Sequence, residues 1–170
     1  MVRKHEICTM QILLIAATEH EIKPVNAEIS GLDLLITGIG VPSTMYHLQK
    51  RIHQKKYELI IQAGIAGCFN ADFALGKTVL VKKDCFADLG IEEKENYTPI
   101  FKTPLATEDE FPFEKGWLVN RTVFKNNAAL PFVNAKTVNK VRESGMQKQQ
   151  FINSFNADIE SMEGAALHYV

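Results

Sequence analysis

The sequence predicts a three-layer α/β/α domain with a mainly parallel, mixed central sheet, and three observations support this prediction. The chain has 170 residues, of which 46% are hydrophobic, and this is enough to bury the core of one domain. Short runs that are apolar on both faces recur, as in strands buried between two helical layers. Helical patterns lie between these runs, and such alternation is typical of parallel sheets.

The predicted strands are the apolar runs, which are rich in Ile, Val and Leu. None approaches the ~20 residues that a membrane-spanning helix needs. They cover residues 12–17, 32–37, 59–63, 78–81 and 132–138.

The first run has a second interpretation, because Arg3 and Lys4 precede residues 12–17 as in a secretory signal peptide. However, the run is shorter than the ~7–15 apolar residues of such a peptide, and Glu19 and Glu21 follow it closely. A buried strand is therefore favoured.

Two helices are predicted from apolar residues at positions i, i+3 and i+7. The first covers residues 22–29, and Pro24 is compatible with it only near its beginning. The second covers residues 45–52 and follows Pro42 and Ser43, which suit the first turn and the cap of a helix.

Residues 88–116 show neither the apolar runs of a buried strand nor the apolar spacing of a helix, and they are predicted to form a long loop excursion. A loop of that length in a compact domain is usually functional or disordered. Two interpretations stay open. The segment is either a mobile surface excursion or a cover over a ligand or a partner subunit, made by Tyr97, Phe101, Phe111 and Phe113.

Charge and cysteine content exclude several classes of function. The formal net charge is -1, so there is no electrostatic reason to expect nucleic-acid or membrane binding. The three cysteines include no close pair and the five histidines show no ligand-like spacing, so neither a disulfide framework nor a metal site is expected. We expect a cytoplasmic protein that acts on a small molecule without a cofactor.

Glycine-containing turns follow two of the predicted strands. Residues 38–43 begin like a dinucleotide-binding turn, but Ser43 stands where the third glycine belongs, so a tight strand-to-helix turn is favoured over an NAD site. Residues 64–67 combine two glycines with Ala66 after a strand. Small residues at such a place let the backbone approach a ligand closely.

Two carboxylates stand at informative places. Glu21 follows the first strand, and it either points into the cleft beyond the sheet or is a solvated acid at a helix N-terminus. Glu163 lies between Met162 and Gly164, where burial of a carboxylate without hydrogen-bond donors would be costly. Its donors are either protein groups or ligand hydroxyls, and the alternative is that it caps the helix that follows.

Four motifs occur in the order found in one known superfamily, and they cover residues 12–21, 37–40, 63–67 and 161–166. Together they resemble the nucleoside phosphorylase and methylthioadenosine/adenosylhomocysteine nucleosidase superfamily. That resemblance implies the superfamily's α/β fold and a single domain over residues 1–170. Within the superfamily, residues 137–141 and 159–170 resemble the futalosine hydrolase branch.

The resemblance implies hydrolysis of the N-glycosidic bond between a purine base and a ribosyl carbon. Glu21 matches the acid that activates the attacking water, and Glu163 matches the glutamate that binds the ribose hydroxyls. Departure of the base leaves a cation-like ribosyl group, so an anion and a positioned water both help. The other substrate-binding residues that the resemblance implies are Ala17, Ile65, Ala66, Gly67, Val138, Asn139 and Met162.

Three departures from the pattern refine this activity. The arginines match no phosphate-binding motif of the phosphorylases, which favours water as the nucleophile. Residues 136–139 replace the base-stacking Gly-Asp-Ala-Phe segment of the nucleosidases, which argues against methylthioadenosine and makes Asn139 a candidate contact with another base. The superfamily's leaving-group contacts follow the helix that begins near Glu163, and the sequence ends at Val170 before them, as in a chain truncated at its C-terminus.

The resemblance therefore implies a futalosine hydrolase-like enzyme that releases hypoxanthine from futalosine, a reaction of menaquinone biosynthesis. It also implies a homodimer or a larger homo-oligomer. Two alternatives remain, a nucleosidase or phosphorylase of another purine nucleoside and a nucleoside-binding domain that no longer catalyses.

Overall fold

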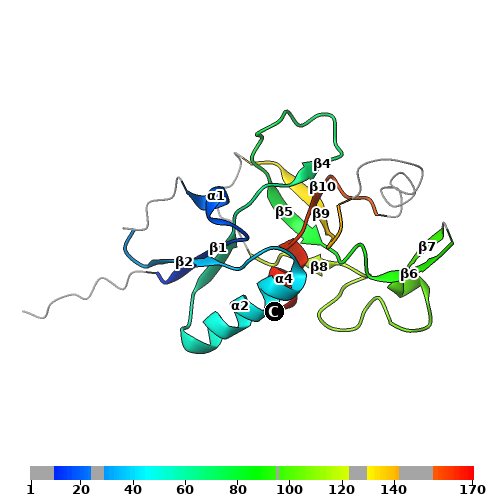
Figure 1. Ribbon diagram of the computed structural model, residues 1–170, viewed down its shortest axis with the longest axis horizontal. Helices are drawn as coiled ribbons and strands as arrows, with labels where there is room; N and C mark the ends of the chain where they lie inside the picture. Colours follow the sequence, from blue (N-terminus) through cyan, green and yellow to red (C-terminus); the bar gives the residue numbers. More distant parts are fainter. Residues whose placement is uncertain (1–9, 24–28, 95, 123–129, 142–154) are drawn as a thin grey trace, which may run out of the picture.

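The computed structural model describes residues 10–23, 29–94, 96–122, 130–141 and 155–170. Strand β1 (Ile12–Ala16) lies between β2 (Leu32–Ile36) and β3 (Leu59–Gln62) in a three-stranded sheet whose pairings are both parallel (Figure 1). These three strands are the first three that the sequence predicts, so their places in the chain and their parallel pairing are confirmed.

The second predicted helix is confirmed and begins earlier than the apolar spacing indicates. Helix α2 (Val41–Gln54) has Pro42 in its first turn, but Gly40, rather than Ser43, is the residue before its first helical residue. The Ser43 hydroxyl donates instead to the Thr37 carbonyl at 2.6 Å. The serine therefore ties the end of β2 to the helix.

The first predicted helix is wrong in its extent. Helix α1 (Glu19–Ile22) ends before Pro24, and Ile29 lies in a bend with its side chain exposed. A proline is tolerated only in the first turn of a helix, and α1 begins at Glu19, too early for Pro24 to belong to its first turn. Residues 24–28, which include Val25 of that spacing, lie outside the described residues.

Helices lie on both faces of the three-stranded sheet. Leu13 and Ile15 of β1 pack with Leu48 of α2. Between them in the sequence, Leu14 packs with Ile22 of α1. Figure 1 shows α1 and α2 on opposite sides of β1 and β2. The layered α/β/α arrangement is therefore confirmed at β1, whose two faces are both buried.

A second sheet has five strands in the order β4-β10-β9-β5-β8. The central strand β9 pairs in parallel with β5 and β10, whereas the edge strands β4 and β8 pair antiparallel. The mixed, mainly parallel strand pairing is thus confirmed, but the strands are divided between a three-stranded and a five-stranded sheet. The bounds are β4 Gly67–Cys68, β5 Leu80–Asp84, β8 Leu118–Val119, β9 Phe132–Thr137 and β10 Ile159–Ser161.

Helix α4 (Gly164–Tyr169) follows β10 and packs between the helix α2 of the three-stranded sheet and the five-stranded sheet. It contacts α2 beside the three-stranded sheet as well as β9, β5 and β8 of the five-stranded sheet. In Figure 1 it lies between α2 and these strands. The residues at the beginning of α4 are therefore placed where both sheets end.

Residues 88–116 are more regular than the predicted loop. Strands β6 (Gly90–Glu93) and β7 (Asn96–Pro99) form an antiparallel hairpin, and the short 3-10 helix η1 (Ile100–Lys102) follows. The β6 side chains are all exposed, so the strand lacks the alternation of apolar and polar residues from which a strand is predicted. The loop prediction is wrong for these residues.

Most aromatic side chains of this segment pack on the chain itself. The Tyr97 hydroxyl donates to a backbone carbonyl at 2.7 Å. The rings of Phe101 and Phe113 lie 4.9 Å apart, and the Phe113 ring lies 5.7 Å from the Tyr169 ring. Phe111, in contrast, is 94% exposed. Within this chain the segment therefore covers the end of α4.

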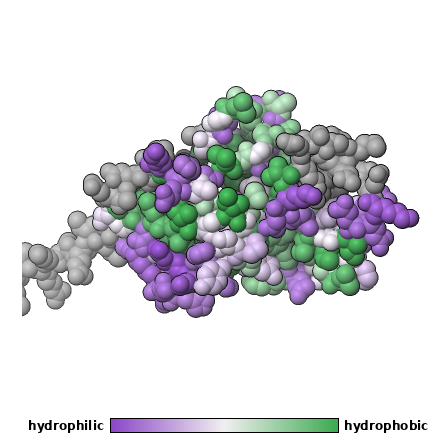
Figure 2. Space-filling view, in the orientation of Figure 1, coloured by the Kyte–Doolittle hydropathy of each residue, from purple (hydrophilic) through white to green (hydrophobic). Residues whose placement is uncertain are grey.

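Figure 2 shows hydrophilic residues gathered over α2 and over the β6–β7 hairpin, with apolar residues exposed between them. In the part of the chain that the structure describes, no helix has both the length and the hydropathy that crossing a membrane requires.

Candidate functional site

Glu21 lies in the short helix α1, where the chain turns after β1, and backbone amides hold both oxygens of its carboxylate. One oxygen accepts the Thr18 amide at 2.8 Å and the Thr18 hydroxyl at 3.1 Å. The other accepts the Ile65 amide at 3.2 Å. Glu21 is therefore more than the solvated helix acid of the alternative interpretation, because one oxygen completes the helix cap and the other faces the loop after β3.

Gly64 leaves the space that this carboxylate occupies. A Cβ atom added to Gly64 would lie 2.8 Å from the nearer Glu21 oxygen, closer than real Cβ contacts. The small residue in this loop thus admits a carboxylate of the chain itself. The sequence indicated close approach of a ligand at residues 64–67, and the structure identifies Glu21 as one group that approaches there.

Glu163 is 7% exposed and binds the turn between β2 and α2. Its carboxylate accepts the Gly40 amide at 2.9 Å, across 123 residues of sequence. Gly40 has a φ of 88°, and Gly38 in the same turn has a φ of 77°, a region that favours glycine. The glycines of this turn therefore form a tight turn, as favoured from the sequence, and they also present an amide to a carboxylate.

The two carboxylates lie beyond the same edge of the three-stranded sheet, because Glu21 accepts an amide of the loop after β3 and Glu163 accepts an amide of the turn after β2. Burial raises the pKa of Glu163, the Gly40 amide opposes that rise, and the negative charge of Glu21 adds to it. The parallel register of Ala16 with Ile36 explains this placement, because it brings the ends of β1 and β2 to the same edge.

Asn139 lies exposed beside the same turn. Its side-chain oxygen accepts the Val41 amide at 3.1 Å, and its own backbone amide donates to the Asp88 carboxylate at 2.5 Å. Because a backbone N–H only donates, the side-chain oxygen must face Val41, and the NH₂ group of Asn139 is the part that can donate to another molecule. The predicted base contact is therefore a donor, placed one residue from the Glu163 partner Gly40.

The remaining predicted contact residues differ in exposure. Ile65 is 84% exposed, whereas Ala17 is 8% exposed and Val138 is 0% exposed, within a hydrophobic cluster. Val138 therefore lies beneath the site rather than on its surface. Ala66 and Gly67 are exposed and Met162 is half-buried.

Sequence reasoning missed a buried polar group beneath Glu163. Asp84 is 0% exposed at the end of β5, and burial raises its pKa to about 7. Its carboxylate accepts the Cys85 amide at 2.7 Å and lies 3.1 Å from the Thr137 hydroxyl. In the sequence Asp84 follows Lys82 and Lys83, and a run of three charged residues gives no signal of a buried carboxylate.

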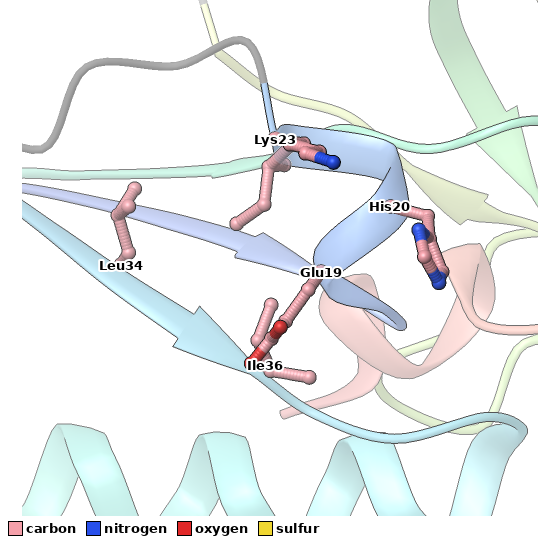
Figure 3. Close-up of a pocket in the computed structure, with 6 residues that line it drawn as sticks. Glu19, His20, Lys23, Leu34 and Ile36 are labelled. Carbon is pink, nitrogen blue, oxygen red and sulfur yellow. The ribbon is translucent and has the colours of Figure 1, made fainter.

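A groove lies between α1 and β2. Its lining residues, five of which Figure 3 labels, come from α1 and β2: Glu19, His20, Ile22, Lys23, Leu34 and Ile36. Neither candidate carboxylate lines it, so it is separate from the site described above.

Neither a protein-family model nor a curated protein matches the sequence. Solved structures do match. The 5'-methylthioadenosine/S-adenosyl homocysteine nucleosidase of Campylobacter jejuni matches with a TM-score of 0.70 and 20% identity, over 94% of this chain and 78% of that chain. A futalosine hydrolase mutant of Helicobacter pylori strain 26695 matches with a TM-score of 0.71 and 16% identity, over 94% and 83%.

A 5'-methylthioadenosine/S-adenosylhomocysteine nucleosidase from Helicobacter pylori, solved with butyl-thio-DADMe-Immucillin-A, matches with a TM-score of 0.72 and 18% identity, over 95% of this chain and 78% of that chain. At such identities the likeness concerns the fold. The chain therefore has the nucleoside phosphorylase-like α/β fold that these nucleosidases and futalosine hydrolase share.

Proposed function

We propose that the chain hydrolyses the N-glycosidic bond of a purine nucleoside, and that its substrate is futalosine. The observation that carries this proposal is the placement of Glu21 and Glu163 at the same edge of the three-stranded sheet, each held by a backbone amide of a glycine-containing loop. Solved nucleosidases and a futalosine hydrolase with the same fold support it.

In the proposed reaction, an oxygen of water bonds to the ribosyl carbon while the bond from that carbon to the base nitrogen breaks. Glu21 accepts the proton that the water loses. The bonding electrons leave with the base nitrogen, which takes up a proton from solvent water, and Glu21 then returns its proton to the solvent. Glu163 accepts hydrogen bonds from the ribose hydroxyls, and its negative charge favours the cation-like ribosyl group of the transition state.

The resemblance of residues 137–141 and 159–170 favours futalosine, and Asn139 supports a hypoxanthine nucleoside over an adenine nucleoside. With its oxygen facing Val41, this side chain offers a donor. A donor suits the ring carbonyl of hypoxanthine, the base of futalosine, whereas adenine carries an amino donor at that position. The same argument makes methylthioadenosine the poorer substrate.

The test is release of free base by the full chain from futalosine, inosine and methylthioadenosine, each with and without phosphate. We expect hypoxanthine from futalosine without phosphate, and Glu21→Gln as the inactive control. Cleavage of inosine that requires phosphate would identify a phosphorylase instead. Tight nucleoside binding without any product would identify a binding domain.

A further inference from the structure

Glu163 stands at the N-cap of α4 but does not cap it. Acidic and hydroxyl side chains at this position normally accept the amide two or three residues on. The Glu163 carboxylate makes no such bond and accepts the Gly40 amide at 2.9 Å instead. The alternative that Glu163 is a capping carboxylate is therefore wrong, and other groups must satisfy the first amides of α4.

Two hydroxyls from the five-stranded sheet take that role. The Gly164 amide donates to the Ser161 hydroxyl at 3.2 Å, and the Ala165 amide donates to the Thr137 hydroxyl at 2.8 Å. Ala165 is 0% exposed, so water cannot replace Thr137 as the acceptor. The two hydroxyls belong to β10 and β9, so the five-stranded sheet holds the acceptors in place.

Asp84 sets the direction of the Thr137 hydroxyl. The hydroxyl oxygen lies 3.1 Å from each oxygen of Asp84, and both residues are 0% exposed. A hydroxyl has one proton and two lone pairs. When its proton points to Asp84, a lone pair is left for the Ala165 amide.

We propose that Asp84, Thr137 and Ser161 are positioning residues that cap α4 in place of Glu163 and so keep the Glu163 carboxylate at the Gly40 turn. The nature of the ligand that Glu163 meets there, a ribose, rests on the proposed function. Whether the Glu163 carboxylate accepts the Gly40 amide or caps α4 depends on the chain itself and needs no ligand. Without the Thr137 hydroxyl, the carboxylate is drawn from Gly40 to the unsatisfied amide of Ala165.

The test compares Thr137→Val, Ser161→Ala and the conservative Thr137→Ser in the full chain. Thr103→Val is the matched control, because the Thr103 hydroxyl likewise accepts a backbone amide, that of Leu105, at 3.2 Å, while it donates to the Ile100 carbonyl at 2.6 Å. The readouts are KM and kcat for futalosine and the titration of the Glu163 carboxyl by ¹³C NMR. Glu163→Gln identifies the signal.

We expect Thr137→Val to raise KM about tenfold, the effect of one capping hydrogen bond. It should also shift the pKa of Glu163, because the carboxylate exchanges the Gly40 amide for the Ala165 amide and approaches the buried Asp84 carboxylate; the Glu21 charge is the same in every variant. Thr137→Ser should restore both values. Ser161→Ala should shift both in the same direction, and Thr103→Val should leave both unchanged.

A folded Thr137→Val with unchanged KM and unchanged Glu163 titration would overturn the proposal, since a merely structural role lowers only thermal stability. If Thr137→Val does not fold, an unchanged Glu163 titration in Ser161→Ala overturns it. If the wild-type chain hydrolyses no nucleoside, the proposed function fails, while the titration still decides the positioning role.

Discussion

At the scale of single residues, backbone amides rather than charged side chains fix the two candidate carboxylates. Glu21 is held by the amides of Thr18 and Ile65, and Glu163 by the amide of Gly40. Amides of a folded loop are already oriented before a ligand arrives, so they place charge without reorganisation. No described Lys or Arg forms an ion pair with either carboxylate.

We predict that Glu21→Gln lowers the hydrolysis rate by a factor of about 10²–10⁴, because the amide cannot accept a proton from water. Gln has nearly the same shape, so nucleoside affinity should be retained. Turnover and equilibrium binding are measured on the same preparation. The control is Glu19→Gln, since Glu19 lines the groove between α1 and β2, which Glu21 does not line, and should be dispensable. Near-normal turnover of Glu21→Gln would show that Glu21 is not the base.

At the scale of elements, α4 depends on the absence of a side chain at its first residue. A Cβ atom on Gly164 would lie 2.3 Å from an Asp84 oxygen and 3.1 Å from the Ser161 hydroxyl. Replacement of a helical Gly by Ala normally stabilises a helix by about 1 kcal/mol. Here the helix begins in contact with a fully buried carboxylate that has no room to move away.

We predict that Gly164→Ala lowers the free energy of unfolding by about 1–2 kcal/mol, because overpacking by about 1–3 kcal/mol exceeds the helix-propensity gain. Denaturant titration measures this change. Adding Asp84→Ser should make room for the new methyl group, so the double variant should lose less than the sum of the single losses. A more stable Gly164→Ala variant would contradict the predicted contact.

At the scale of the whole molecule, Asp84 couples stability to pH. Its native pKa is about 7, raised by burial from an ordinary value of 3.8. Between these values the native state binds more protons than the unfolded state, so the free energy of unfolding falls as pH rises. The stabilisation is complete below the unfolded pKa and is lost as pH rises through about 7.

We predict that Asp84→Asn, which carries no titrating proton, removes this contribution, at most about 1.4 kcal/mol per pH unit. The stability of the variant relative to wild type should therefore rise between about pH 4 and pH 7, because only in the wild type does unfolding release a proton in this range. Denaturant titrations of both proteins at several pH values give the difference. Parallel curves for the two proteins would mean that Asp84 does not titrate in this range.

Local patterns in the sequence predict much of this fold because they report burial. Runs that are apolar on both faces predict β1, β2 and β3, and the spacing that predicts α2 is confirmed by the burial of Leu48. The same logic fails where burial is not the cause of structure. The exposed β6–β7 hairpin has no apolar alternation, and a proline limits α1.

The sequence by itself determined the α/β class, the order of the strands along the chain and the choice of Glu21 and Glu163 as candidate residues, since each depends on neighbouring residues. Only the tertiary structure decided what those carboxylates do. Strand order and parallel register bring Gly40 to Glu163 across 123 residues and place Thr137 under the first turn of α4. Such contacts join segments far apart in the chain, and a local pattern carries no information about which distant amide or hydroxyl will meet it.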